Sequence, residues 1–111
     1  MKLITAIVRP DKLDELIGVL VDNQAHGLTV TEVRGFGRQF GQLGTVPGPA
    51  PAALLHKIRL DVVALDDDVE TLVEAIAKHA RTETIGDGKI WVTQVDGALR
   101  VRTGERDRAA I

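Results

Sequence analysis

The 111-residue chain is predicted to form one α+β domain that spans residues 1–111. Four short segments show the alternating or continuous apolar pattern of β-strands, and two longer segments carry apolar residues at the spacing of amphipathic helices. Their order is strand, helix, strand, a long stretch rich in glycine and proline, then strand, helix, strand. This order predicts the ferredoxin-like βαββαβ arrangement, in which an antiparallel four-stranded sheet carries two helices on one face.

The first half of the chain supplies two strands around one helix. Residues 3–8 form a continuous apolar run, which is typical of a strand buried on both faces. Residues 13–21 carry leucine, isoleucine and valine at helical spacing, and Asp11 is expected to be the N-cap of that helix. Residues 28–33 are rich in β-branched side chains and predict the second strand.

The second half begins with a segment that is not expected to pack. Residues 35–51 hold five glycines and three of the four prolines of the chain, a density that breaks helices and strands. Residues 57–63 then alternate apolar and charged side chains and predict the third strand. Residues 66–80 predict the second helix and residues 89–95 the fourth strand. Residues 99–102 predict a short fifth strand.

The composition excludes several kinds of protein. Fourteen basic and sixteen acidic side chains give a net charge of −2, so neither nucleic acid nor an anionic membrane is expected as a partner. The chain has no cysteine, which excludes disulfides and cysteine nucleophiles and fits the cytoplasm. No apolar run reaches the length of a signal peptide or a membrane span. We therefore expect a cytoplasmic protein without direct membrane insertion.

The predicted sheet has one face that its two helices cannot cover. The first strand is apolar on both sides, because Leu3 and Ile7 alternate with Ile4, Ala6 and Val8. An uncovered apolar sheet face exceeds the apolar patch that soluble monomers normally expose. We therefore expect an oligomer whose sheets pack together.

Four cationic residues lie at predicted strand ends or glycine turns, namely Arg38, Lys89, Arg100 and Arg102. Arg100 and Arg102 are two apart on a predicted strand, so their guanidinium groups leave one face and suit neighbouring phosphates of a nucleotide. The turn at 86–89, Gly-Asp-Gly-Lys, would place N–H groups and an ammonium around an anion, although it lacks the Walker A pattern. Each feature alone is better explained by an ordinary turn or a solvated strand edge. Their combination favours an anion site.

No set of residues in the sequence predicts catalysis. There is no evident nucleophile with a base, and the three histidines share no metal-ligand spacing. A non-catalytic protein is therefore expected. A slow nucleotide-hydrolysing enzyme that uses the same cleft is the alternative from another class.

Residues 29–39, which read TVTEVRGFGRQ, resemble the PII signal-transduction family. The resemblance resumes at Lys57 and continues through IGDGKI at 85–90 and RVRTGE at 100–105 to the final AAI. It covers nearly the whole chain except about residues 40–56. Membership of this family implies a homotrimer of ferredoxin-like subunits with three sites for ATP or ADP in the clefts between them.

The resemblance also implies roles for individual residues by matched position. Nucleotide binding is implied for twelve residues, the first four near the adenosine and the others around the phosphates: Ile7, Thr29, Gly35 and Ala64, then Gly37, Arg38, Gly86, Asp87, Gly88, Lys89, Arg100 and Arg102. Gln39 is implied in binding Mg²⁺ and 2-oxoglutarate beside ATP. Lys57 is implied in pairing with a carboxylate of that acid.

Residues 37–55 match the family's T-loop, the long arm that contacts a regulated transporter or enzyme, but they depart from its usual sequence. The chain has no tyrosine, so the tyrosyl uridylylation or adenylylation known in the family is chemically impossible. The loop also carries no charged residue from Phe40 to Leu55. The sequence therefore leaves the identity of the partner open.

The function expected from the resemblance is that of a trimeric signal-transduction protein that binds ATP or ADP and a small carboxylate such as 2-oxoglutarate. It would regulate its partner through the T-loop. The alternative within the family is a PII-like sensor of adenylates and bicarbonate, tied to carbon fixation or transport.

Overall fold

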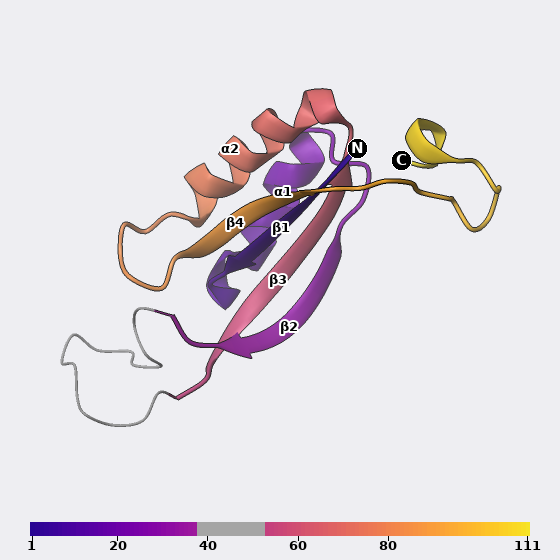
Figure 1. The fold of residues 1–111 in the computed structure, drawn as a ribbon. Coiled ribbons are helices and arrows are strands. Elements are labelled where there is room, and N and C mark those ends of the chain that lie inside the picture. The colour runs from indigo at the N-terminus through magenta and orange to yellow at the C-terminus, as the bar shows by residue number, and fades with distance from the viewer. Residues whose placement is uncertain (38–52) are drawn as a thin grey trace.

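The computed structural model describes residues 1–37 and 53–111. Most of the expected T-loop, including Arg38 and Gln39, lies outside the described residues. The regular elements follow one another as β1 (Lys2–Val8), α1 (Leu13–Asp22), β2 (Thr29–Gly35), β3 (Leu55–Ala64), α2 (Val69–Ala80) and β4 (Gly88–Gln94) (Figure 1). Short 3₁₀ turns at Pro10–Lys12 and Asp66–Asp68 lead into the two helices, and a third lies at Asp107–Ala110.

The four strands form one antiparallel sheet in the order β2-β3-β1-β4. Both helices lie on the same side of this sheet (Figure 1). β1 is central, and Ile7 near its end stands opposite Arg59 of β3 and Lys89 of β4. The predicted ferredoxin-like α+β fold is confirmed.

The hydrophobic core lies between the helices and one face of the sheet. Ile4, Ala6 and Val8 alternate inward from β1 and are at most 1% exposed. The other buried apolar side chains come from β3 and from the inner faces of the helices: Ile58, Leu60, Val62, Ala64, Leu16, Leu20, Leu72, Ile76 and Ala80. Every second side chain of the strands and every third or fourth side chain of the helices therefore pack into one core.

The opposite face of the sheet is not covered by either helix (Figure 1). At its centre Thr5 is fully buried and donates its hydroxyl hydrogen to Asp61 Oδ1 at 2.8 Å, while Arg59 Nε donates to Asp61 Oδ2 at 2.9 Å. Burial would raise the pKa of Asp61, but the hydrogen bonds from Arg59 and Thr5 outweigh it and hold the pKa below its usual value. Trp91 lies opposite Thr5 and is 39% exposed in the single chain. The expected uncovered face therefore exists, but its centre is polar and not apolar, and the trimer remains a prediction.

Asp11 was expected to be the N-cap of the first helix, and this prediction is wrong. Residues Pro10–Lys12 form a 3₁₀ turn, and neither that turn nor α1 has a side-chain capping hydrogen bond. Pro10 fixes φ near the helical value at the first position and lacks an N–H that needs a partner, so the N-cap position is Arg9, two residues before the expected Asp11.

The predicted fifth strand at residues 99–102 is also wrong. Leu99 pairs with Arg106 in an isolated bridge, and the chain reverses between them. The N–H of Gly104 donates to the carbonyl of Arg100 at 2.8 Å, and Gly104 has φ +75°, a conformation that glycine adopts without steric cost. Arg100 and Arg102 therefore stand on a turn, and the argument that strand pleating directs both to one face does not hold.

Among the described residues, no helix is long and apolar enough to cross a bilayer.

Candidate functional site

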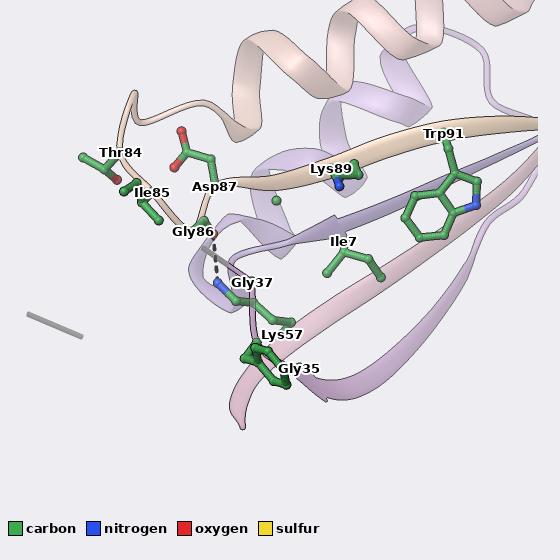
Figure 2. A pocket seen from close by; sticks show the side chains of 12 residues that line it. Ile7, Gly35, Gly37, Lys57, Thr84, Ile85, Gly86, Asp87, Lys89 and Trp91 are labelled. Carbon is green, nitrogen blue, oxygen red and sulfur yellow. Dashed lines mark hydrogen bonds between the residues drawn. The ribbon is translucent and has the colours of Figure 1, made fainter. Parts of the chain in front are cut away.

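A cleft of about 480 Å³ opens at one end of the sheet (Figure 2). Antiparallel pairing brings the final residues of β1 and β2 and the first residues of β3 and β4 to this end. The cleft is lined by Ile7, Gly35, Phe36, Gly37, Lys57, Thr84, Ile85, Gly86, Asp87, Gly88, Lys89 and Trp91. Eight of these residues are nucleotide- or effector-site candidates from the sequence: Ile7, Gly35, Gly37, Lys57, Gly86, Asp87, Gly88 and Lys89.

Two lysines supply positive charge to the cleft. Lys89 is exposed and lies beside Ile7 on the uncovered face of the sheet. Lys57 is only 9% exposed, and its ammonium donates to the carbonyl oxygen of Gly86 at 2.8 Å, as Figure 2 shows. Burial lowers the pKa of Lys57, the nearby Arg9 lowers it further, and Asp87 partly opposes them.

The turn that precedes β4 requires glycine. Gly86 and Gly88 have φ of 104° and 107°, a region that side chains rarely adopt. A Cβ at Gly88 would lie 1.7 Å from the carbonyl oxygen of Ile7, which is backbone and cannot move aside. Successive N–H groups in such a turn form a concave site for anions.

Asp87 lies within this turn but serves as its internal acceptor. Its carboxylate accepts hydrogen bonds from the N–H of Thr82 at 2.7 Å, the N–H of Glu83 at 2.8 Å and Arg9 Nε at 3.1 Å, and also from the Thr82 hydroxyl. Desolvation would raise the pKa of Asp87, but these hydrogen bonds outweigh it and hold the pKa well below the usual range. Figure 2 shows the carboxylate pointing away from Lys57.

Apolar side chains complete the cleft. Ile7 and Trp91 line it from the sheet, and Phe36 and Ile85 line it from the ends of β2 and of the turn. Phe36 is 58% and Ile85 64% exposed. A site that joins apolar surface to glycine N–H groups and ammonium groups suits a ligand with an aromatic ring and an anionic tail.

The remaining described candidates lie at the other end of the sheet. Thr29 and Arg100 line a separate hollow of about 550 Å³. Ala64 pairs with Lys2 at the start of β1, and its side chain is buried in the core. β4 runs from Gly88 to Gln94, so the two ends of the sheet are separated by roughly 20 Å along this strand. The single chain therefore does not bring the arginine pair to the glycine turn.

The two arginines themselves are placed differently. Arg100 Nη1 forms an ion pair with Glu105 at 3.0 Å, and its Nη2 donates to the terminal Ile111 at 3.4 Å. Arg102 is exposed on the turn. The C-terminal segment that carries both extends beyond the end of β4 (Figure 1).

Sequence reasoning missed five residues at the cleft. Four of them line the cleft, namely Phe36, Thr84, Ile85 and Trp91. The fifth, Arg9, does not line the cleft but donates hydrogen bonds to Thr84 and Ile85 in its wall. Trp91 was within reach of prediction, because it lies two residues after Lys89 on a strand and shares its face. Arg9 gave no such signal, because its partners lie 75 to 78 residues away in the sequence.

The fold and the cleft define a ferredoxin-like α+β domain with a candidate binding cleft at one end of its sheet. A family model described as "Nitrogen regulatory protein P-II" matches residues 1–105. The chain is 47% identical to nitrogen regulatory protein P-II 2 of Methanothermobacter thermautotrophicus, over 100% of this chain and 97% of the relative. It is 47% identical to nitrogen regulatory protein P-II of Cereibacter sphaeroides and 42% identical to nitrogen regulatory protein GlnK of Escherichia coli, over 100% of each chain. The chain belongs to the P-II family of signal-transduction proteins.

The carboxylate of Asp87 is expected to stabilise the fold in a pH-dependent way. Asp87→Asn replaces an acceptor of several hydrogen bonds and should lower the free energy of unfolding by about 1–2 kcal/mol at pH 7. The folded state holds the pKa of Asp87 below the value of about 3.9 in an unfolded chain. The stabilisation is therefore complete above about pH 4 and is lost as the pH falls through the folded-state pKa.

Chemical denaturation at a fixed protein concentration, repeated from pH 7 down to about pH 2, measures this effect. The gap between wild type and Asp87→Asn should narrow as the pH falls below about 4. Asp96→Asn is the matched control, because Asp96 is exposed and has no hydrogen bond or ion pair with the described residues. A gap that stays constant with pH would contradict the assigned role of the Asp87 carboxylate.

Proposed function

We propose that this protein is a non-catalytic, trimeric sensor of ATP and ADP. The observation that carries the proposal is the cleft, where Gly86, Gly88, Lys57 and Lys89 gather beside the apolar surface of Ile7. Such a combination suits the phosphates and the base of one nucleotide. The relatives are named as regulatory proteins and not as enzymes, which supports a sensor over the slow nucleotide hydrolase.

The nucleotide site is proposed to lie between two subunits. Each chain carries the glycine turn and Lys89 at one end of its sheet, and Thr29 with Arg100 at the other end. The two ends are separated by roughly 20 Å, which is too far for one triphosphate to contact both. Association of copies through the uncovered sheet face would bring the turn of one copy near the arginine pair of the next. The separation supports a head-to-tail closed trimer.

Within that site, the roles follow from the chemistry of each group. The N–H groups of the glycine turn and the ammonium of Lys89 would hold phosphate oxygens, and Arg100 and Arg102 of a neighbouring copy would contribute two planar donors. Ile7 would contact the adenosine. Ala64 has a buried side chain, so only its main chain remains available to a ligand.

The signal is proposed to leave the site through residues 37–55, most of which lie outside the described residues. Gly35 and Gly37 line the cleft at the point where this segment begins, so a nucleotide bound in the cleft would contact the start of the segment. ATP and ADP would change partner binding only if they bind the alternative conformations of residues 37–55 with different affinities. The proposed partner is a regulated transporter or enzyme. The absence of tyrosine excludes tyrosyl modification, so ligand binding is the proposed input.

The second effector is proposed to be 2-oxoglutarate, bound with ATP and Mg²⁺. Lys57 lies in the cleft as a buried ammonium beside the turn, where it suits a carboxylate. Gln39, the expected Mg²⁺ ligand, lies outside the described residues. Bicarbonate is the alternative effector. A protein that senses adenylates and bicarbonate would be connected to carbon fixation or transport.

Nucleotide binding is expected to depend on Lys89. Calorimetric titration of the wild-type protein should show binding of both ATP and ADP, and Lys89→Ala should weaken ATP binding roughly tenfold or more through loss of a charged contact. Lys78→Ala is the matched control, because Lys78 is exposed on α2 away from the cleft. No binding by wild type would refute the sensor proposal. Release of phosphate over many turnovers would favour the hydrolase.

Mixed trimers test whether each site uses two subunits. Lys89→Ala and the double variant Arg100→Ala/Arg102→Ala should each bind ATP poorly when assembled alone. After the two are unfolded and refolded together, every mixed trimer has one interface at which both halves of the site are intact. Titration should then recover about one tight ATP site for each mixed trimer. No recovery in verified mixed trimers would indicate that each site belongs to one chain.

Lys57 is expected to decide the response to the acid effector. Titration of 2-oxoglutarate into wild-type protein saturated with ATP and Mg²⁺ should release heat, and Lys57→Met should abolish that binding because the methionine has no charge to pair. Lys78→Met is the control. Heat from bicarbonate and none from 2-oxoglutarate would select the alternative sensor. Unchanged 2-oxoglutarate binding in Lys57→Met would exclude the assigned role of Lys57.

A further inference from the structure

Arg9 lies outside the cleft but holds the turn that forms one of its walls. Its Nε donates to Asp87 Oδ1 at 3.1 Å, and its Nη2 donates to Thr84 Oγ1 at 2.8 Å and to the carbonyl of Ile85 at 2.9 Å. One guanidinium thus contacts three residues of a four-residue stretch. The side chain is 24% exposed, so these contacts are partly shielded from water.

A second cation, Lys57, also holds this turn. Lys57 donates to the carbonyl of Gly86, so the carbonyls of Ile85 and Gly86 are both bound by cationic side chains. In a trans peptide the N–H points opposite to the preceding carbonyl. Because the carbonyl of Ile85 is directed to Arg9, the N–H of Gly86 is directed away from Arg9. The direction of the Ile85 carbonyl therefore fixes the Gly86 N–H as a donor that an anion could meet, whereas the N–H of Asp87 donates to the carbonyl of Thr84 at 3.3 Å.

The main chain of Arg9 is itself held in place. It follows β1 directly, and Val8 at the end of that strand pairs with Gly88 at the start of β4. It also precedes Pro10, which favours extended backbone at the residue before it, and Arg9 has φ −65° and ψ 140°. Arg9 meets its three acceptors from two separate nitrogens, Nε and Nη2, of a rigid planar group, whereas an ammonium holds its three donors on a single atom.

We propose that Arg9 is a positioning residue for the anion-binding turn, and that it sets the affinity for the phosphate groups of a nucleotide without contacting them. The effect on affinity rests on the proposed nucleotide-sensing function. The effect on the turn itself does not, because it follows from the contacts of Arg9 with Thr84, Ile85 and Asp87.

The test compares Arg9→Gln and Arg9→Lys with the matched control Arg81→Gln. Arg81 is exposed near the same turn, and its side chain has no hydrogen bond or ion pair with the described part of the chain. The control therefore removes the same charge without removing the contacts. One readout is amide hydrogen exchange of residues 82–88 in the ligand-free protein, and the other is calorimetric titration with ATP, ADP and adenosine.

Arg9→Gln should speed exchange in residues 82–88 while leaving exchange in α1 and β3 unchanged, and should weaken ATP binding roughly tenfold with adenosine binding unaltered. Arg9→Lys should fall between Arg9→Gln and wild type, and Arg81→Gln should match wild type. Unchanged exchange in Arg9→Gln would overturn the proposal whatever the protein binds. Equal losses in Arg9→Gln and Arg81→Gln would also overturn it, because charge alone would then explain them.

If wild type binds no nucleotide, the sensor function fails and the exchange readout still tests the positioning role. If wild type binds ATP and Arg9→Gln binds it equally well, the positioning role fails and the sensor function stands. Arg9→Lys keeps the test informative if Arg9→Gln does not fold.

Discussion

The close approach of Gly88 to the carbonyl oxygen of Ile7 is the constraint on which the site depends. A side chain at position 88 would collide with backbone at 1.7 Å, so β4 can begin beside β1 only with glycine there. This contact lies at the end of the β1–β4 register that places Lys89 opposite Ile7. The register carries Trp91 to the same face two residues later. Glycine at position 88 and the β1–β4 register thus position both the turn before β4 and the cleft beside it.

The sequence predicts what depends on local pattern and fails where distant residues decide the structure. The alternation in β1 and β3 and the helical spacing of Leu16 and Leu20 are local, and they locate the core correctly. The turn at 86–89 is also found from its glycines. Residues 99–102 predict a strand, yet the chain reverses at Gly104 and places Arg100 and Arg102 on a turn.

The candidate site shows the same division. Motifs located eight lining residues, but they did not reveal that Asp87 turns its carboxylate to Thr82 and Glu83 instead of the cleft. Nor did they reveal Arg9, whose role depends on the antiparallel pairing that brings it to the turn. A net charge of −2 is similarly uninformative, because Arg9, Lys57 and Lys89 gather at one edge of an otherwise acidic protein.

Trp91 is the only tryptophan of the chain, and it lines the cleft from the uncovered face of the sheet. With no tyrosine present, almost all ultraviolet fluorescence of the unmodified protein originates from this one ring. The indole is 39% exposed in the single chain, so its emission should change when a ligand or another subunit displaces water from the ring. The protein thus carries a built-in optical reporter, at the place where ligand entry and subunit contact would both register.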